Sequence, residues 1–133
     1  MTKQAGWKFN WKAEAKLTDR QLFKLVIEGN RNIVQGLISI SNHETHMFMW
    51  LIESAPFNFG KPKLYAGVPG NLVAFVCKTS AEKGYGGFVS FTSKTKLIQH
   101  YIDTLGAVHV GGHRMVIFEK AASKLINHYF KSK

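Results

Sequence analysis

Apolar and polar residues alternate along the first half of the chain, a pattern typical of strands with one buried face. Gly29, Asn30 and Arg31 separate two of these runs, and glycine and asparagine accept the positive φ of a tight hairpin turn. The polar residues 42–46 form a second turn. The sequence therefore predicts an antiparallel meander with strands at Trp7–Trp11, Gln21–Glu28, Asn32–Ser41 and Met47–Ala55.

In the second half the apolar residues recur at helical spacing. A helix is predicted at Asn71–Lys83, where Gly84 ends it, and a second helix is predicted between a capping Ser93 and Gly106. Because strands joined by helices tend to lie parallel, the whole pattern predicts an α/β domain with a mixed sheet. Its remaining elements are strands at Gly87–Phe91 and Arg114–Phe118 and a final helix at Ala121–Phe130.

Composition limits the class of protein. A chain of 133 residues with 45% hydrophobic residues is long enough for one folded domain with a real core. No apolar run is long enough to cross a bilayer, and the N-terminus lacks the apolar segment of a signal peptide. The single cysteine, Cys77, fits a reducing compartment, so we expect a cytoplasmic protein without a membrane partner.

Charge and a glycine-rich turn together indicate an anionic ligand. The formal net charge is +10, which favours anionic partners. Gly67 and Gly70 lie where a strand-like segment gives way to an apolar helix, and a helix N-terminus presents free N–H groups and the positive end of its dipole. This turn predicts a phosphate site, with flanking charges from Lys61, Lys63, Lys78 and Lys83.

The region from Gln21 to Phe118 resembles the Gcn5-related N-acetyltransferase (GNAT) superfamily. The resemblance is carried by the sequence Gly67-x-Pro69-Gly70 at the start of a helix and by a later helix containing Tyr101, which ends at Leu105-Gly106-Ala107. It implies one GNAT-like domain over residues 1–133, with a mixed, mostly antiparallel sheet flanked by helices. It also implies acetyl-CoA as co-substrate, with its pyrophosphate held by the loop amides.

Three features depart from the family pattern. The usual Arg or Gln of the loop is Leu64, and the second small residue is Pro69, which has no N–H to donate. The phosphate cradle is therefore expected to use the amides of Val68, Gly70, Asn71 and Leu72, beside Gly67. The family's two helices between its first strands are reduced to residues 12–20, which shortens the wall that would hold the acceptor.

The resemblance implies a catalytic role for Tyr101, which would protonate the departing CoA thiolate. The alternative for Tyr101 is a core tyrosine with its hydroxyl at the surface. Glu53 could accept a proton from an amine, directly or through water, or could instead neutralise nearby lysines. Cys77 has no neighbour that would activate it and is expected in the core.

These observations predict acetyl transfer to a small-molecule or peptide amine, with a second copy of the chain as a possible partner. Two alternatives stay open: a non-catalytic GNAT-like module that binds CoA, and a basic protein that binds nucleic acid through phosphate contacts and aromatic stacking. His43 and His46 lie in a predicted turn without a third ligand nearby, so no metal site is expected. Nucleotide-binding, hydrolase and zinc motifs are absent from the sequence.

Overall fold

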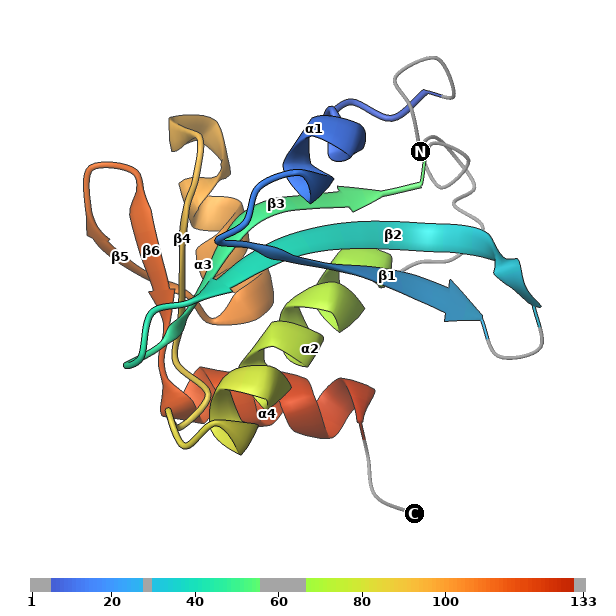
Figure 1. Cartoon of the computed structure of the whole chain (residues 1–133). Helices are drawn as coiled ribbons and strands as arrows, with labels where there is room; N and C mark the ends of the chain where they lie inside the picture. Colours follow the sequence, from blue (N-terminus) through green and yellow to red (C-terminus); the bar gives the residue numbers. More distant parts are fainter. Residues whose placement is uncertain (1–5, 28–29, 56–66, 131–133) are drawn as a thin grey trace.

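The computed structural model describes residues 6–27, 30–55 and 67–130, which form one six-stranded sheet with helices on both faces (Figure 1). A single turn of 3₁₀ helix at Thr95–Leu97 leads into α3. The strands are β1 (Gln21–Ile27), β2 (Asn30–Asn42), β3 (Met47–Ser54), β4 (Val89–Thr92), β5 (Val108–Gly111) and β6 (Arg114–Ile117). The helices are α1 (Trp11–Ala15), α2 (Val68–Glu82), α3 (Ile98–Leu105) and α4 (Glu119–Tyr129).

The sheet has the order β1-β2-β3-β4-β6-β5. All neighbouring strands are antiparallel except β3 and β4, which are parallel and are joined through α2. The predicted mixed, mostly antiparallel sheet is thereby confirmed. The predicted hairpin is also confirmed as β1 and β2, although Asn30 and Arg31, which were expected in its turn, already belong to β2. Residues 28–29 lie outside the described residues.

Two hydrophobic clusters lie on opposite faces of the sheet. The larger joins the sheet to α2, α3 and α4 and includes Ile38, Met47, Val76 and Ile117, all of them fully buried. The smaller is built around Trp7 and Trp11 and holds α1 against the other face. Figure 1 shows this division, with α1 on the side away from α2 and α4. Among the described residues, no helix has the length and apolar character needed to span a membrane.

The structure corrects the predictions for the N-terminal segment and for two element starts. Residues 7–11 are not a strand, because the Asn10 side chain accepts a hydrogen bond from the Ala13 amide and starts α1 at Trp11. Helix α2 begins at Val68, three residues earlier than predicted. Ser93 does not cap α3, since its hydroxyl donates to the Lys94 carbonyl. Strand β5 was not predicted.

Strand β3 is paired with β4 only near its own beginning. Their ladder runs from Met47↔Val89 to Met49↔Phe91, whereas β3 continues to Ser54. On its other side, β3 has a bulge at Trp50, because Ile40 pairs with Met49 and Ser39 pairs with Leu51. The two strands therefore separate after Met49, as Figure 1 shows, and a gap opens in the middle of the sheet.

Gly36 of β2 allows the beginning of α2 to lie against the sheet. A Cβ atom at this position would lie 2.8 Å from Val68 Cγ1 and 2.9 Å from Leu72 Cδ1. Contacts this short require these side chains or the helix that carries them to shift. The absence of a side chain at Gly36 therefore fixes how closely the first turn of α2 approaches β2.

We predict that Gly36→Ala lowers the free energy of unfolding by about 1–3 kcal/mol, the usual cost of overpacking. In the double variant with Val68→Ala the added methyl group loses its shortest contact and keeps only the one with Leu72 Cδ1 below 3 Å, so the two losses should be less than additive, with a coupling of about 0.5–3 kcal/mol. Urea denaturation of the four proteins measures this coupling. Strictly additive losses would show that Gly36 does not set the approach of α2.

Candidate functional site

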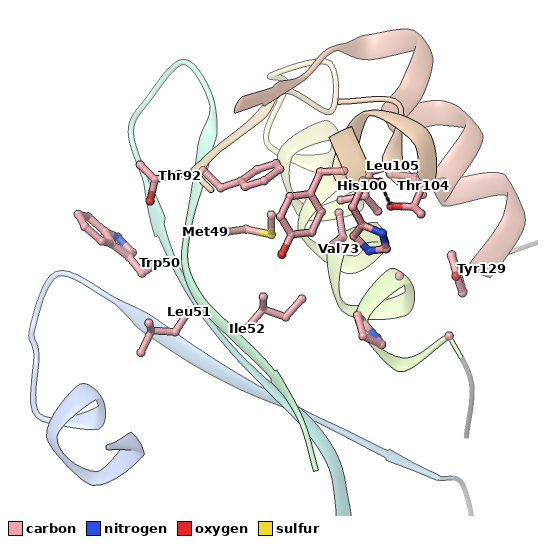
Figure 2. Close-up of a pocket in the computed structure, with 16 residues that line it drawn as sticks. Met49, Trp50, Leu51, Ile52, Val73, Thr92, His100, Thr104, Leu105 and Tyr129 are labelled. Carbon is pink, nitrogen blue, oxygen red and sulfur yellow. Dashed lines mark hydrogen bonds between the residues drawn. The ribbon is translucent and has the colours of Figure 1, made fainter. Parts of the chain in front are cut away.

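A cavity of about 370 Å³ occupies the gap between the diverging strands. Figure 2 shows Met49 and Ile52 of β3 pointing toward the helices, and Trp50 and Leu51 pointing the other way. The cavity thus lies on the side of the sheet that the helices cover and extends toward the other face at Trp50. Its lining comes from β3 (Met49, Trp50, Leu51, Ile52), α2 and its cap (Gly67, Pro69, Gly70, Val73), β4 (Phe91, Thr92), α3 (His100, Tyr101, Thr104, Leu105) and α4 (Leu125, Tyr129).

The first turn of α2 lies at one end of this cavity. Gly67 is the N-cap, with a left-handed backbone (φ 89°), and Pro69 occupies a first-turn position where its missing N–H costs no helical bond. The Asn71 amide already donates to the Gly67 carbonyl (2.9 Å). Only the first N–H groups of a helix lack partners within it, so those of Gly67, Val68 and Gly70 are left.

This donor set differs from the predicted one because the helix starts earlier. Asn71 and Leu72 were expected to offer amides, yet both lie beyond the first turn, and the Leu72 side chain is buried in the core. Gly67, Val68 and Gly70 keep the predicted position at the helix N-terminus. The positive end of the helix dipole faces the same point.

Tyr129 of α4 stands over this helix end. A Cβ atom built on Gly70 would lie 2.8 Å from Tyr129 Cζ and closer still to the hydroxyl oxygen. Gly70 thus has no room for a side chain while Tyr129 keeps its place. The tyrosine hydroxyl and the free amides are gathered at one end of the cavity, and all of them are hydrogen-bond donors suited to an anion.

Tyr101 also lines the cavity. It comes from the middle of α3, and its ring packs edge-on against Phe91 with 5.4 Å between the ring centroids. Burial raises the pKa of the Tyr101 phenol above its usual value. The phenol therefore stays protonated at neutral pH and can act as a proton donor.

The backbone of β3 supplies further polar groups. After Met49, β3 has no ladder with β4, so the N–H and C=O groups on its β4 side face the cavity between Trp50 and Ile52. Unpaired strand N–H groups can bind a carbonyl oxygen, as a neighbouring strand would. This feature depends on register and bulge position, which the sequence pattern did not reveal.

Glu53 lies apart from Tyr101 and does not line the cavity. Its carboxylate is buried on the α1 face, where it accepts hydrogen bonds from the backbone amides of Lys8 (2.6 Å) and Phe9 (3.2 Å) and from Trp11 Nε1 (2.9 Å). The geometry favours an anchor for the N-terminal segment. The role of Glu53 as a base stays a prediction.

Within the part of the chain that the structure describes, none of the predicted lysines lines the cavity. Lys61 and Lys63 lie outside the part of the chain that the structure describes. Lys78 is on α2, with its Nζ 5.0 Å from the centre of the Phe130 ring, and does not line the cavity.

The expectation for Cys77 agrees with the structure. Cys77 is in the core, and burial raises its pKa to about 12, so it is a thiol without nucleophilic character. No cluster of metal-binding side chains occurs within residues 6–27, 30–55 and 67–130.

Trp50, His100 and Tyr129 line the cavity but were missed by sequence reasoning. Alternation along β3 could have identified Trp50, since Met47 and Met49 are buried and the residues between point to the other face. His100 directly precedes Tyr101 on α3, so the prediction that Tyr101 lines a site could have included His100. Tyr129 is brought to Gly70 only by the packing of α4 on α2, and no local pattern signals it.

Comparison with solved structures identifies the class of fold. The chain is similar to Tetrahymena GCN5 (TM-score 0.57, 10% identity, 87% of this chain and 79% of that one). It is also similar to AtaTR bound with AcCoA (0.56, 15%, 80% and 72%) and to a KacTA–DNA complex (0.59, 12%, 88% and 79%).

The chain has a GNAT-like fold. At these identities the likeness concerns the fold alone. No family model matches the sequence, and no curated protein matches it either.

We predict that Glu53→Gln lowers the free energy of unfolding by about 1.5–3 kcal/mol, because its amide nitrogen would replace an oxygen that accepts hydrogen bonds. Thermal or urea unfolding measures the change. Glu82→Gln, at the exposed end of α2, is the matched control and should stay within about 0.5 kcal/mol of the wild type. Equal stability of all three proteins would contradict the anchor role.

Proposed function

We propose that this protein transfers an acetyl group from acetyl-CoA to an amine. The observation that carries the proposal is one cavity, between the separated strands β3 and β4, that joins the free N–H groups of α2 to the protonated phenol of Tyr101. The GNAT-like fold supports the same class of reaction. We infer that the chain works as one such domain, while a homodimer stays a prediction.

The residues present fit CoA at both ends of the cavity. The amides of Gly67, Val68 and Gly70 and the Tyr129 hydroxyl would hold the pyrophosphate, where the helix dipole adds a favourable field. Apolar side chains of β3, α2 and α3, such as Ile52, Val73 and Leu105, would contact the pantetheine arm. The β3 N–H groups would bind the thioester carbonyl oxygen as negative charge develops on it.

The reaction we propose is direct attack of a neutral amine on the thioester carbon. A C–N bond forms, the C–S bond breaks, and the amine proton leaves to water. Tyr101 gives its phenolic proton to the departing thiolate and then recovers one from solvent. Because Glu53 is hydrogen-bonded on the α1 face, it is not needed in this sequence of steps.

A non-catalytic module that binds CoA is the second candidate. It is favoured by the N-terminal region, where the described residues form a single helix, α1, five residues long, whereas the family resemblance implies two helices along the acceptor. The variants below separate binding of CoA from turnover.

Gly70→Asp should weaken acetyl-CoA binding by about tenfold or more, because it places a carboxylate beside the pyrophosphate and displaces Tyr129. Gly70→Asn has nearly the same size without the charge and should lose clearly less affinity. Isothermal titration calorimetry of the three proteins tests this. Equal and small effects of both substitutions would place the pyrophosphate elsewhere.

Tyr101→Phe should lower kcat by about a hundred- to ten-thousandfold, the contribution of a positioned acid. The dissociation constant of acetyl-CoA should hardly change, since the ring stays packed on Phe91. The control is Tyr85→Phe, which removes a hydroxyl bonded to Asn42 outside the cavity and should leave kcat unchanged. Release of free CoA thiol in the presence of amines, aminoglycosides or peptides measures turnover.

Full activity of Tyr101→Phe would remove Tyr101 from the mechanism. If the wild type binds acetyl-CoA but acetylates none of these amines, the non-catalytic module is the better account.

A further inference from the structure

A row of aromatic side chains crosses the face of the sheet opposite α2, α3 and α4. It consists of His46, His43, Phe48 and Trp50, and we refer to it as the aromatic row. Neighbouring ring centroids are 5.4 Å apart for His46 and His43, 5.7 Å for His43 and Phe48, and 4.6 Å for Phe48 and Trp50. The row runs along β3 from the β2–β3 turn to the cavity, which Trp50 itself lines.

The aromatic row is held in place by polar contacts. Trp50 Nε1 donates to Ser41 Oγ (2.8 Å), and the same hydroxyl is 2.7 Å from His43 Nε2. Arg20 covers one face of Trp50, with its guanidinium carbon 3.9 Å from the ring centre. Trp50 is nevertheless 40% exposed, and His43 is also exposed. These rings are therefore fixed in orientation before any ligand arrives.

Cationic side chains border the aromatic row. Arg114 of β6 lies on the same face, since its neighbour Met115 is buried in the opposite core, and its charge contributes to lowering the pKa of His46. Lys94 and Lys96 are exposed, two and four residues after the end of β4, whose last residue Thr92 pairs with Arg114 and lines the cavity. The whole chain carries a formal charge of +10.

The carboxylates nearest to the cavity on this face are engaged. Glu14 is buried and accepts hydrogen bonds from Ser39 Oγ (2.6 Å) and Arg20 (2.7 Å), and Glu53 binds the N-terminal segment. Asp19 lies 3.8 Å from Arg20, and Glu44 is at the exposed β2–β3 turn. A polycationic acceptor would find few free partners here, whereas a polyanion with planar rings would find both charge and stacking surfaces.

We propose that the aromatic row and its cationic border bind single-stranded nucleic acid. Nucleobases would stack on Phe48, Trp50 and the exposed His43, and phosphates would lie near Arg114, Lys94 and Lys96. Aromatic platforms beside a positive surface bind single strands with little sequence preference. A second copy of this chain is disfavoured as the occupant, since two such surfaces would bring like charges together.

Binding of nucleic acid to the aromatic row does not require acetyl transfer. The inference rests on the proposed function only in placing the bound nucleic acid beside an acetyl-transfer site. The test is therefore made without acetyl-CoA. Fluorescence anisotropy with a labelled single-stranded RNA of about 20 nucleotides, a length that spans several base-stacking sites, measures the dissociation constant. The same oligonucleotide as a duplex and a poly-glutamate peptide are the competitors.

Phe48→Leu and Trp50→Leu remove ring faces but keep apolar volume, and each should weaken binding about five- to a hundredfold. Phe118→Leu removes an aromatic side chain with similar exposure (42%) that packs on Phe88, outside the aromatic row, and should leave affinity unchanged. Arg114→Gln should reduce the slope of log K against log salt by about one. Thermal unfolding identifies any variant that is not folded. Arg114 is exposed, so Arg114→Gln should stay folded and tests the proposal even if a tryptophan or phenylalanine variant does not fold.

Four results would overturn the proposal. They are no binding by the wild type, equal losses in Phe118→Leu and Trp50→Leu, displacement by poly-glutamate as effective as by RNA, and a change of oligomeric state in Trp50→Leu by analytical ultracentrifugation. If the wild type binds RNA but transfers no acetyl group, the result contradicts the proposed function and leaves this inference standing.

Discussion

The structure depends on the point at which β3 and β4 stop pairing. Their three-pair parallel ladder ends at Met49↔Phe91, and the cavity is lined by this last pair and by the part of β3 beyond it. Separation of two central strands would normally leave backbone groups without partners in the core. Here the bulge at Trp50 keeps β3 paired with β2 while its other side faces the cavity. The gap thus provides both the space and the hydrogen-bonding groups of the site.

Glycines at two places set how α2 lies beside this gap. Gly36 lets the first turn of the helix rest on β2, and Gly70 lets Tyr129 rest on the helix end. A helix dipole acts over about one turn, so close approach at both places decides whether the free amides face the cavity. On the other face, the buried carboxylates Glu14 and Glu53 tie α1 and the segment before it to the sheet. The short N-terminal region is therefore fixed by hydrogen bonds as well as by Trp7 and Trp11.

Sequence reasoning succeeded where local signals agree with the fold. The hairpin, the presence of a helix after the glycine-rich turn and the end of α3 at Gly106 all follow from turn and cap chemistry. The order of elements together with the family resemblance indicated a GNAT-like sheet. It failed where the outcome depends on distant partners. The alternation at Trp7–Trp11 suggests a strand, but Glu53, more than forty residues away, receives the amides of Lys8 and Phe9. The row of rings on β3 and the place of Tyr129 likewise depend on register and packing.

The most direct test of this account is a two-dimensional ¹⁵N NMR titration of the protein with acetyl-CoA. The largest shifts should fall on the amides of Gly67, Val68 and Gly70 and along Trp50–Ile52, with a weaker response on α1. No binding, or shifts gathered on the opposite side of the sheet around Trp11, Leu22 and Leu37, would contradict it.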